Sequence, residues 1–363
     1  MDKKNITKYK ILNYLLNQGP ASKAELAKQQ NLSMPTVLST VNSLMELGIL
    51  TEMGELESTG GRKARLVGLE PDYRYAIGAN ITANRLSMVL VNLEGAIIKQ
   101  ERIRFKFRPD VTYCSDLSAH IQSFYADTAA SEKILGIGIS LPGIINKAQR
   151  LLTKSHALQL ENYSLKIMEQ LLPLPAYFEN DANAAMLAEN PQLLGNAVYL
   201  SLNNTLGGSV CINGTLFTGQ NQKSGEFGHT ILAPHGKQCY CGKKGCADAY
   251  CAASVLTDNG QQPLEAFMEK IGKDAKTDAA WQEYLEYLAM LISNIRMAFD
   301  TDIILGGDVG GFLPDHMVEL GKKVLKYNLF DGDLSYLKNC TYKKEASAVG
   351  VARHFFQELI SQM

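Results

Sequence analysis

Four side chains of metal-binding types lie close together in the second half of the chain. Three cysteines fall within eight residues and a histidine precedes them; in chain order the set is His229, Cys239, Cys241 and Cys246. Three thiolates and an imidazole satisfy tetrahedral zinc, and such a set is a closed, structural type of site. Cysteines at this spacing suit a metal better than a disulfide framework. The spacing therefore predicts one structural zinc ion per chain, with His235 as the competing imidazole.

The cysteines belong to longer motifs that resemble a known family. Residues 225–229 read GEFGH and residues 239–248 read CYCGKKGCAD; further matches are Pro142-Gly143, ENDANAA at 179–185 and ILGG at 304–307. These runs resemble motifs of the ROK family, which contains repressors and sugar kinases, and in particular its xylose and N-acetylglucosamine repressors. The resemblance covers essentially the whole chain. It implies a two-lobed α/β body of the actin and sugar-kinase (RNase H-like) type, with a sugar bound in the cleft between the lobes.

The resemblance also implies which side chains contact the sugar. Asn180 and Asp181 resemble the sugar-contacting pair whose aspartate serves the kinases as a base, and Glu226 with His229 resembles the E-x-G-H motif. Asp248 stands where the family usually has glutamate, so its sugar contact would come from a shorter side chain. The chemistry agrees, because carboxylates and amides can hydrogen-bond adjacent hydroxyls. The alternative for Asn180 and Asp181 is a helix cap at the start of the following helix.

Two loops that hold phosphate in the family's kinases are altered in this chain. The kinases open their first hairpin with D-x-G-G-T-K, whereas residues 80–85 read NITANR. Their second loop, G-T-G-x-G-G, corresponds to residues 203–208, which read NNTLGG. Glycines let the backbone approach phosphate closely, and several of them are missing here. We therefore expect no enzyme activity, with the Gly306-Gly307 turn kept as a structural bend, and retain an ATP-dependent sugar kinase as the alternative.

The residues around these motifs predict alternating strands and helices. Strands are expected at 75–82, 86–93, 97–107, 134–141, near 197–217 and at 303–305, and helices near 113–127, 181–189 and 280–299. This alternation predicts an α/β body. Its first lobe is expected to comprise about residues 73–188 plus a C-terminal helix at 345–363. The second lobe, about residues 189–344, would contain the zinc loop.

The first 70 residues have the pattern of a helix-turn-helix domain. Apolar residues at helical spacing predict a first helix that stops at the Gly-Pro pair 19–20. Ser22 and Glu25 form a capping box for a short second helix, and Ser33 caps a third that runs to about residue 47. Five side chains of the third helix are expected to point outward: Met34, Thr36, Ser39, Thr40 and Asn42. Such a helix fits the major groove of DNA, so these five are the predicted DNA contacts.

A hairpin is expected after the third helix. Strands at 48–50 and 64–67 flank the run STGGRK at 58–63, whose glycines would let a cationic tip approach DNA closely. Arg62 and Lys63 are predicted to reach phosphates or the minor groove, as the wing of the domain. The helices alone would also fit a protein-interaction module, and a basic tip alone would also fit a solvated turn. Helices and wing together favour binding to double-stranded operator DNA.

The charge and composition are compatible with this division. The chain has 363 residues and a net charge of −1 at pH 7. Residues 1–70 hold nine Lys/Arg and seven Asp/Glu, 9 − 7 = +2, and the remainder holds 27 and 30, 27 − 30 = −3. This asymmetry permits a DNA-binding head on an acidic body. Because there is no apolar stretch of about 18 residues and no signal-peptide core, we expect a cytoplasmic protein without a membrane span.

These observations predict a sugar-responsive transcriptional regulator, a repressor of carbohydrate-utilisation genes that a sugar releases from its operator. The expected domains are a winged helix-turn-helix head at residues 1–70 and a sugar-binding body at residues 71–363. Two heads in a homodimer, or in a tetramer of paired dimers, would read an operator of two half-sites. Xylose, glucose and N-acetylhexosamines are all compatible effectors within the family. A scaffold that binds neither DNA nor ATP is the remaining alternative.

Overall fold

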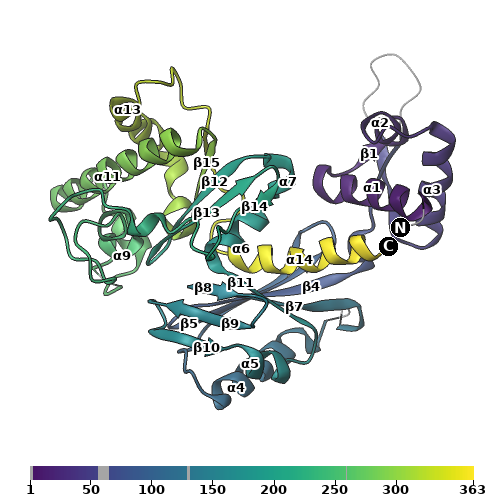
Figure 1. The fold of residues 1–363 in the computed structure, drawn as a ribbon, viewed down its shortest axis with the longest axis horizontal. Helices are drawn as coiled ribbons and strands as arrows, with labels where there is room; N and C mark the ends of the chain where they lie inside the picture. The colour runs from purple at the N-terminus through teal and green to yellow at the C-terminus, as the bar shows by residue number, and fades with distance from the viewer. Residues whose placement is uncertain (1–2, 56–64, 129–130, 259) are drawn as a thin grey trace.

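The computed structural model describes residues 3–55, 65–128, 131–258 and 260–363. They form an N-terminal head and a body built around two five-stranded sheets (Figure 1). The predicted combination of a helix-turn-helix head and an α/β body is confirmed. Within the described ranges, no helix combines the length and the apolar character that crossing a bilayer requires.

The described part of the head contains three helices and a small sheet with the strand order β1-β3-β2. The elements are α1 (Lys3–Gln18), β1 (Ala21–Ser22), α2 (Lys23–Gln29), α3 (Met34–Glu46), β2 (Leu50–Glu55) and β3 (Arg65–Leu69). Both predicted N-cap hydroxyls are confirmed, whereas the Glu25 carboxylate of the predicted capping box accepts a hydrogen bond from Tyr14 Oη at 3.1 Å. The Ser22 hydroxyl accepts a hydrogen bond from Glu25 N at 3.1 Å, and the Ser33 hydroxyl accepts one from Thr36 N at 3.4 Å. These hydroxyls satisfy amides that have no partner inside their own helix.

The first sheet of the body has the strand order β11-β7-β4-β5-β6. Its strands in chain order are β4 (Tyr75–Ile81), β5 (Arg85–Asn92), β6 (Ile97–Arg104), β7 (Ile134–Leu141) and β11 (Ala176–Asn180). Successive side chains of a strand point to opposite faces. Ile77 of β4 therefore packs with α4 (Val111–Ala126), whereas its neighbour Ala76 packs with α14 (Ala346–Gln362). One helix thus covers each face of this sheet.

A small third sheet, with the order β10-β9-β8, was not expected from the sequence. Its elements are β8 (Ile144–Asn146), β9 (Leu151–Ser155) and β10 (Leu160–Ser164), followed by α5 (Lys166–Leu171). Leu152 and Met168 are buried in the same apolar cluster as α4, which fixes this sheet beside the first. Because β9 ends at Ser155, the sheet delivers the following residues to the cavity described below.

The second sheet has the strand order β14-β13-β12-β15-β16. Its strands are β12 (Ala197–Leu202), β13 (Leu206–Ile212), β14 (Thr215–Leu216), β15 (Asp302–Gly306) and β16 (Leu337–Asn339). Val198 packs on the side of α11 (Ala275–Phe299) and α13 (Met317–Tyr327), and Tyr199 packs on the side of α6 (Asp181–Ala188). The second sheet is therefore also covered on both faces. Shorter helices complete this half: α7 (Pro191–Leu194), α8 (Asp248–Cys251), α9 (Ala253–Leu256), α10 (Leu264–Met268) and α12 (Gly307–Gly310).

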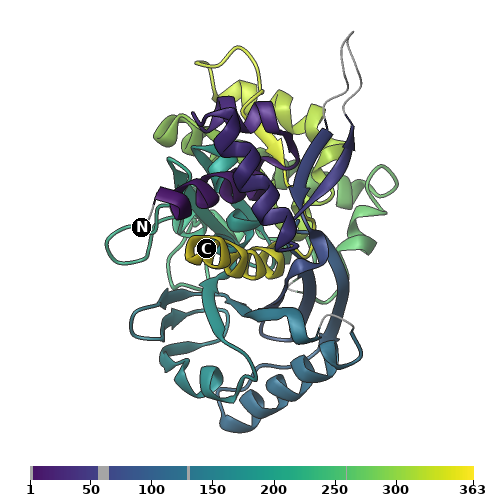
Figure 2. The same cartoon turned by 90° about the vertical axis from the view of Figure 1, so that its right-hand side faces the viewer.

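Helix α14 joins the body to the head. It packs along α6 at its beginning, and its C-terminal half lies beside α1 of the head (Figure 1, Figure 2). Ile11 and Leu12 of α1 belong to the same buried apolar cluster as Phe355 and Phe356 of α14. The head is consequently packed onto the body through a shared core.

Candidate functional site: a metal cluster beside a polar cavity

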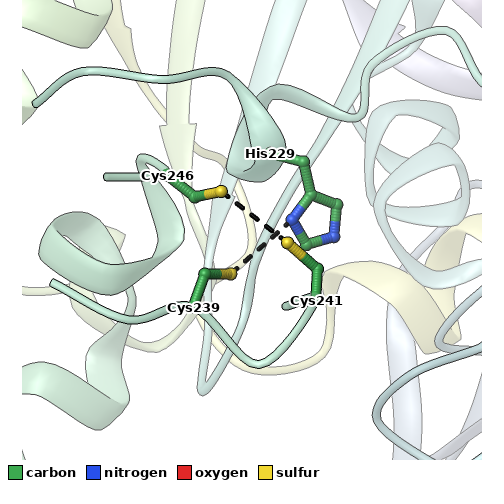
Figure 3. A group of neighbouring side chains, drawn as sticks. All are labelled: His229, Cys239, Cys241 and Cys246. Carbon is green, nitrogen blue, oxygen red and sulfur yellow. Dashed lines mark hydrogen bonds between the residues drawn. The ribbon is translucent and has the colours of Figure 1, made fainter. Parts of the chain in front are cut away.

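The structure brings the four predicted metal ligands together, with their ligand atoms all within 4.8 Å of one another (Figure 3). Cys241 Sγ and Cys246 Sγ are 3.7 Å apart, and His229 Nδ1 is 3.9 Å from Cys239 Sγ. Zn–S bonds of about 2.3 Å in a tetrahedron separate two sulfurs by about 3.8 Å, so the spacing fits a zinc-sized ion. The group is compatible with a structural metal site. The competing His235 is exposed and is not part of it.

Local hydrogen bonds fix the loop that carries these ligands. Cys239 N donates to Lys243 O at 2.9 Å, and Lys243 Nζ donates to the carbonyl oxygen of His229 at 2.7 Å. Lys243 therefore ties the cysteine loop to the histidine. Burial lowers the pKa of His229, and the charges of His156 and Lys243 lower it further. The imidazole is thus held in the neutral form that binds metals.

A cavity of about 310 Å³ lies next to this Cys3His group and is lined by residues from both halves of the body. Its wall includes the turn after β7, the loop after β9, the start of α6, the start of β13 and the loop 222–226. Four of the five predicted sugar-contacting residues line it: Asn180, Asp181, Glu226 and His229. A cavity of this size with a few convergent polar groups suits a small polar ligand.

Asn180 is both a helix cap and a cavity residue. Its side-chain oxygen accepts hydrogen bonds from Ala182 N at 2.9 Å and Asn183 N at 3.0 Å, so it is the N-cap of α6. Its amide group donates to Gly143 O at 3.0 Å. The cap alternative is therefore confirmed for Asn180, and the cap is what holds the beginning of α6, including Asp181, at the cavity wall.

Two carboxylates and an imidazole face the cavity. Burial raises the pKa of Asp181 to about 6; the hydrogen bond from Ala182 N opposes this shift and the charge of Glu226 adds to it. Burial also raises the pKa of Glu226, against the opposing charge of Lys223. His229 Nε2 lies 4.0 Å from Glu226 Oε2, while its Nδ1 faces the cysteines. One imidazole therefore presents one nitrogen to the metal cluster and the other to the cavity.

The structure corrects the prediction for Asp248, which does not line the cavity. Asp248 is buried on α8, and its Oδ1 accepts a hydrogen bond from Leu206 N at 2.6 Å. Leu206 itself lines the cavity. The short aspartate side chain thus supports the wall from behind and makes no direct contact with the cavity. Burial raises the pKa of Asp248 to about 6, opposed by the hydrogen bond from Leu206 N.

Sequence reasoning missed several residues of the cavity wall. The ring of His156 lies 5.8 Å from that of His229 and 5.5 Å from that of Tyr240, between centroids. Glu179, which is 2% exposed, accepts a hydrogen bond from Tyr177 Oη at 2.7 Å and also pairs with Lys147. No local pattern marked His156, because it follows a strand of the small sheet that the sequence did not indicate. Glu179 belongs to the ENDANAA motif, but the motif gave it no predicted role.

The first altered phosphate loop, residues 80–85, and residues 203–204 of the second do not line this cavity, whereas residues 205–208 of the second do. Asn80 Oδ1 accepts a hydrogen bond from Ser140 Oγ at 2.9 Å. Asn203 Oδ1 accepts one from Asp308 N at 2.8 Å, and the Asp308 carboxylate lies 3.9 Å from the Arg102 guanidinium of the first sheet. We call this region, residues 80–85, 203–204 and 306–308, the nucleotide-loop side. Asn80 and Asn203 are therefore already hydrogen-bonded to neighbouring protein groups.

The Gly306-Gly307 turn on this side is required by packing. Gly307 has φ +81°, and a Cβ there would lie 2.7 Å from Leu202 N. A Cβ at Gly306 would meet the Tyr199 hydroxyl at 1.8 Å. Both glycines therefore have a structural reason to be present, in agreement with the interpretation of this turn as a structural bend.

The outer face of α3 carries four of the five predicted DNA contacts in exposed positions: Met34, Thr36, Ser39 and Asn42. The outward orientation predicted for Thr40 is wrong, because this side chain is only 9% exposed. Thr40 lies three residues after Val37 and four before Leu44, so it shares their inward face. Leu38, which is 41% exposed, lies on the outer face instead.

The predicted hairpin of the head is present with longer strands than expected. Strands β2 and β3 pair antiparallel, with Leu50 opposite Leu69. Arg65 at the start of β3 forms an exposed ion pair with Glu52 at 3.0 Å. The predicted cationic tip, Arg62 and Lys63, lies outside the described residues.

The arrangement defines a class of protein: a helix-turn-helix head fused to a two-sheet body that holds a polar cavity beside a Cys3His cluster. The chain belongs to the ROK family, whose model matches residues 76–357. A model described as winged helix-turn-helix DNA-binding matches residues 4–51. The ROK model therefore matches the body, and the DNA-binding model matches the helices of the head.

Proteins of similar sequence or structure agree with both the DNA-binding head and the ROK body. A xylose repressor from Bacillus spizizenii is 27% identical over 315 residues, which cover 83% of this chain and 82% of that protein. An N-acetylglucosamine repressor from Escherichia coli is 24% identical over 314 residues, or 80% of this chain and 77% of that protein. A crystal structure of a ROK family transcriptional regulator, a homologue of the E. coli MLC protein, is 19% identical. It has a TM-score of 0.73 and covers 99% of this chain and 98% of that chain, which shows a shared fold.

Proposed function

We propose that this protein is a sugar-responsive transcriptional repressor that binds operator DNA through its head and a sugar through the cavity of its body. The observation that carries the proposal is the combination, in one chain, of an exposed helix-turn-helix with a cavity lined by Asp181, Glu226 and His229. The names of the xylose and N-acetylglucosamine repressors support a carbohydrate effector. Operator release by the sugar is the expected direction of the response.

The polar groups of the cavity suit the hydroxyls of a sugar. Asp181 and Glu226 would accept hydrogen bonds from hydroxyl groups, while Asn180 and His229 Nε2 would donate them. Asp248 would act indirectly, by holding the Leu206 backbone at the cavity wall. Adjacent hydroxyls demand several donors and acceptors at fixed spacing, and the α6 cap and the cysteine loop provide that rigidity.

We further propose one structural zinc ion per chain. Cys239, Cys241 and Cys246 would bind it as thiolates and His229 through Nδ1, which faces the three sulfur atoms (Figure 3). The ion would hold the cysteine loop against the turn that carries Glu226 and His229. Its role at the sugar site is therefore indirect, through the position of these two side chains.

The protein is not expected to transfer phosphate, although Asp181, the residue that resembles a kinase base, is present. The support comes from the nucleotide-loop side, where Asn80 and Asn203 replace the first residues of the kinase loops and bond to neighbouring protein groups. A coupled assay with ATP and D-xylose, D-glucose or N-acetyl-D-glucosamine should show no sugar-dependent ADP. Turnover that Asp181→Asn abolishes would establish the kinase alternative.

We propose that the chain acts as a homodimer or a pair of dimers, with a head at residues 1–70 and a body at residues 71–363. A helix-turn-helix dimer reads two half-sites about one helical turn, ~34 Å, apart. A sugar that closes the cleft would rotate the two halves of the body and move two heads out of register with these half-sites. The sugar shifts this equilibrium only as far as it prefers the closed state.

The test is a fluorescence-anisotropy titration of the full chain on a labelled fragment of DNA from upstream of its own gene. Affinity should fall steeply with salt, and D-xylose, D-glucose or N-acetyl-D-glucosamine should weaken it at constant salt. Binding that no sugar changes, while one of them raises the melting temperature, would contradict the switch.

Two substitutions on α3 separate DNA contact from fold stability. Asn42→Ala removes an exposed amide and should weaken operator binding by about 1–3 kcal/mol if it meets a base edge, without changing the melting temperature. Thr40→Ala changes a buried residue and should lower the melting temperature instead. Equal effects of both on DNA affinity alone would argue against the proposed reading face of α3.

A further inference from the structure

Asn17 is a buried polar residue at the place where the head meets the body. It lies near the end of α1, is 6% exposed, and belongs to a helix whose inward residues are mainly apolar, such as Ile11 and Leu15. Burying an amide is unfavourable unless its donors and acceptors are satisfied. Asn17 Nδ2 donates to Asn13 O within α1 at 2.7 Å, and the remaining hydrogen bonds of Asn17 show what it contacts outside its own helix.

These bonds form two arms that reach different parts of the body. In the first arm, Asn17 Nδ2 donates to Gln192 Oε1 on α7 at 2.7 Å, and Asn190 Nδ2 donates to the backbone oxygen of Asn17 at 2.7 Å. In the second arm, Gln357 Nε2 on α14 donates to Asn17 Oδ1 at 3.2 Å. Helix α7 leads directly into the second sheet, whereas α14 covers the first sheet. Asn17 thus bridges both halves of the body.

The far ends of both arms lie at Asp181 in the cavity. Helix α6 begins at Asp181 and ends at Ala188, two residues before Asn190. Helix α14 carries Ser347, whose hydroxyl donates to the Asp181 backbone oxygen at 2.8 Å. Gln357 follows ten residues later, about 15 Å along the helix at 1.5 Å per residue. Each arm is therefore a helical connection from a cavity residue to the same side chain of the head.

The two connecting helices are packed too closely to bend independently. A Cβ at Gly350 of α14 would lie only 1.7 Å from the backbone oxygen of Ala184 on α6. Backbones in such close contact move as one body. Figure 1 shows α14 extending from α6 to the head. A displacement at the cavity end is thus carried to the head.

We propose that Asn17 is the positioning residue that couples sugar occupancy of the cavity to the orientation of the DNA-binding head. This inference rests on the proposed function, because it concerns how one bound sugar changes DNA binding. Along the chain, helix α7 is joined to the α6–α14 body only through residues 189–190 and leads into the second sheet, so closure of the cleft moves α7 relative to α14. The side-chain amide of Asn17 cannot keep its hydrogen bonds to both Gln192 and Gln357 when these two residues separate. The head therefore adopts one of two discrete hydrogen-bonded positions.

Coupling is measured in both directions on the full chain. DNA affinity is measured with and without D-xylose, D-glucose and N-acetyl-D-glucosamine, and the affinity of the responding sugar is measured with and without DNA. In the wild type, the factor by which the sugar changes DNA affinity must equal the factor by which DNA changes sugar affinity. Such coupling factors are typically about 5- to 150-fold. In Asn17→Ala both should fall to less than about 2-fold, while DNA and sugar still bind separately.

Two further variants keep the test decisive. Gln192→Ala removes the side-chain acceptor of the first arm, which also accepts from Asn13 Nδ2 at 3.2 Å, and leaves the Asn190 bond in place. It changes an exposed side chain, so it should lose coupling even if Asn17→Ala folds poorly. Asn5→Ala changes an exposed asparagine of the same helix as Asn17 and should keep the wild-type coupling factor between sugar and DNA. Full coupling in both Asn17→Ala and Gln192→Ala overturns the role of Asn17 and leaves the proposed function intact. A wild type that responds to none of the three sugars overturns both, and this result is visible before any variant is measured.

Discussion

The cavity wall that carries Asp181 and Glu226, which we call the sugar side after its proposed ligand, differs from the nucleotide-loop side in what its polar groups do. On the sugar side, Asp181 and Glu226 line an open cavity, and burial raises the pKa of each. On the nucleotide-loop side, Asn80 is hydrogen-bonded to Ser140 and Asn203 to the Asp308 backbone. Carboxylates that face a cavity can accept hydrogen bonds from a ligand, whereas groups already bonded to neighbouring protein atoms serve the fold. The difference supports the proposal that this protein binds a sugar without transferring phosphate to it.

The largest effect should come from removing a metal ligand. Cys246→Ser replaces a fully buried thiol with a poor zinc ligand and should weaken zinc binding by at least about 100-fold. Zinc should fall from one ion per chain by elemental analysis, and sugar affinity should fall with it. Cys340→Ser, outside the cluster, is the matched control and should keep both. Unchanged sugar affinity in a zinc-free Cys246→Ser protein would show that the metal does not support sugar binding.

Asp181→Asn should produce the next largest effect. Losing a charged hydrogen-bond acceptor costs about 1.5–3 kcal/mol, or roughly 10- to 100-fold in sugar affinity by calorimetry. The operator affinity without sugar should stay the same. Asn204→Ala removes an exposed amide from the nucleotide-loop side and should leave sugar affinity unchanged. Similar losses in both variants would erase the contrast between the two sides.

Sugar binding should weaken in acid. Asp181 has its pKa raised to about 6, and a bound hydroxyl favours the ionised acceptor, so the pKa falls on binding. Affinity should therefore be constant above about pH 7 and decrease, by at most about tenfold per unit, as the pH falls through 6. Calorimetry across this range measures it. The Asp181→Asn protein should have lost this dependence; an unchanged profile there would assign the titration to another group.

The smallest effect is expected for the ion pair that spans the two sheets on the nucleotide-loop side. Arg102 and Asp308 are both about one-third exposed and 3.9 Å apart. Pairs of this kind contribute about 0–1 kcal/mol, so Arg102→Ala should change the free energy of unfolding by no more than that. Urea unfolding measures the change. A large loss of sugar response in Arg102→Ala would mean that this side takes part in switching.

The metal cluster and the helix caps of the head could be predicted because their determinants are close in sequence. The four ligands lie between His229 and Cys246, and each cap is decided by one hydroxyl and the amides just after it. Thr40 was placed wrongly because its polarity was given more weight than its position, three residues after Val37. Helical geometry, and not side-chain chemistry, decides which face is inward.

Features set by long-range contacts could not be predicted in the same way. His156 reaches the cavity through a small sheet whose three short strands have no clear periodicity. Asp248 was matched to a sugar contact by its place in a motif, yet its position is decided by the amide of Leu206, 42 residues away. Asn17 gave no signal, since its partners Gln192 and Gln357 are far along the chain.

The two-sided placement of His229 has a consequence for proton position. A neutral imidazole carries one proton, and a ring nitrogen that binds a metal cannot hold it. With Nδ1 directed at the cysteines, metal binding would fix the proton on Nε2, which lies 4.0 Å from Glu226. The histidine would then be a permanent donor toward the cavity, and its partner there would be an acceptor oxygen, either that of Tyr240 at 3.4 Å or one of a bound sugar. Metal loading would in this way select the tautomer, and the tautomer would select which ligand orientations the cavity accepts.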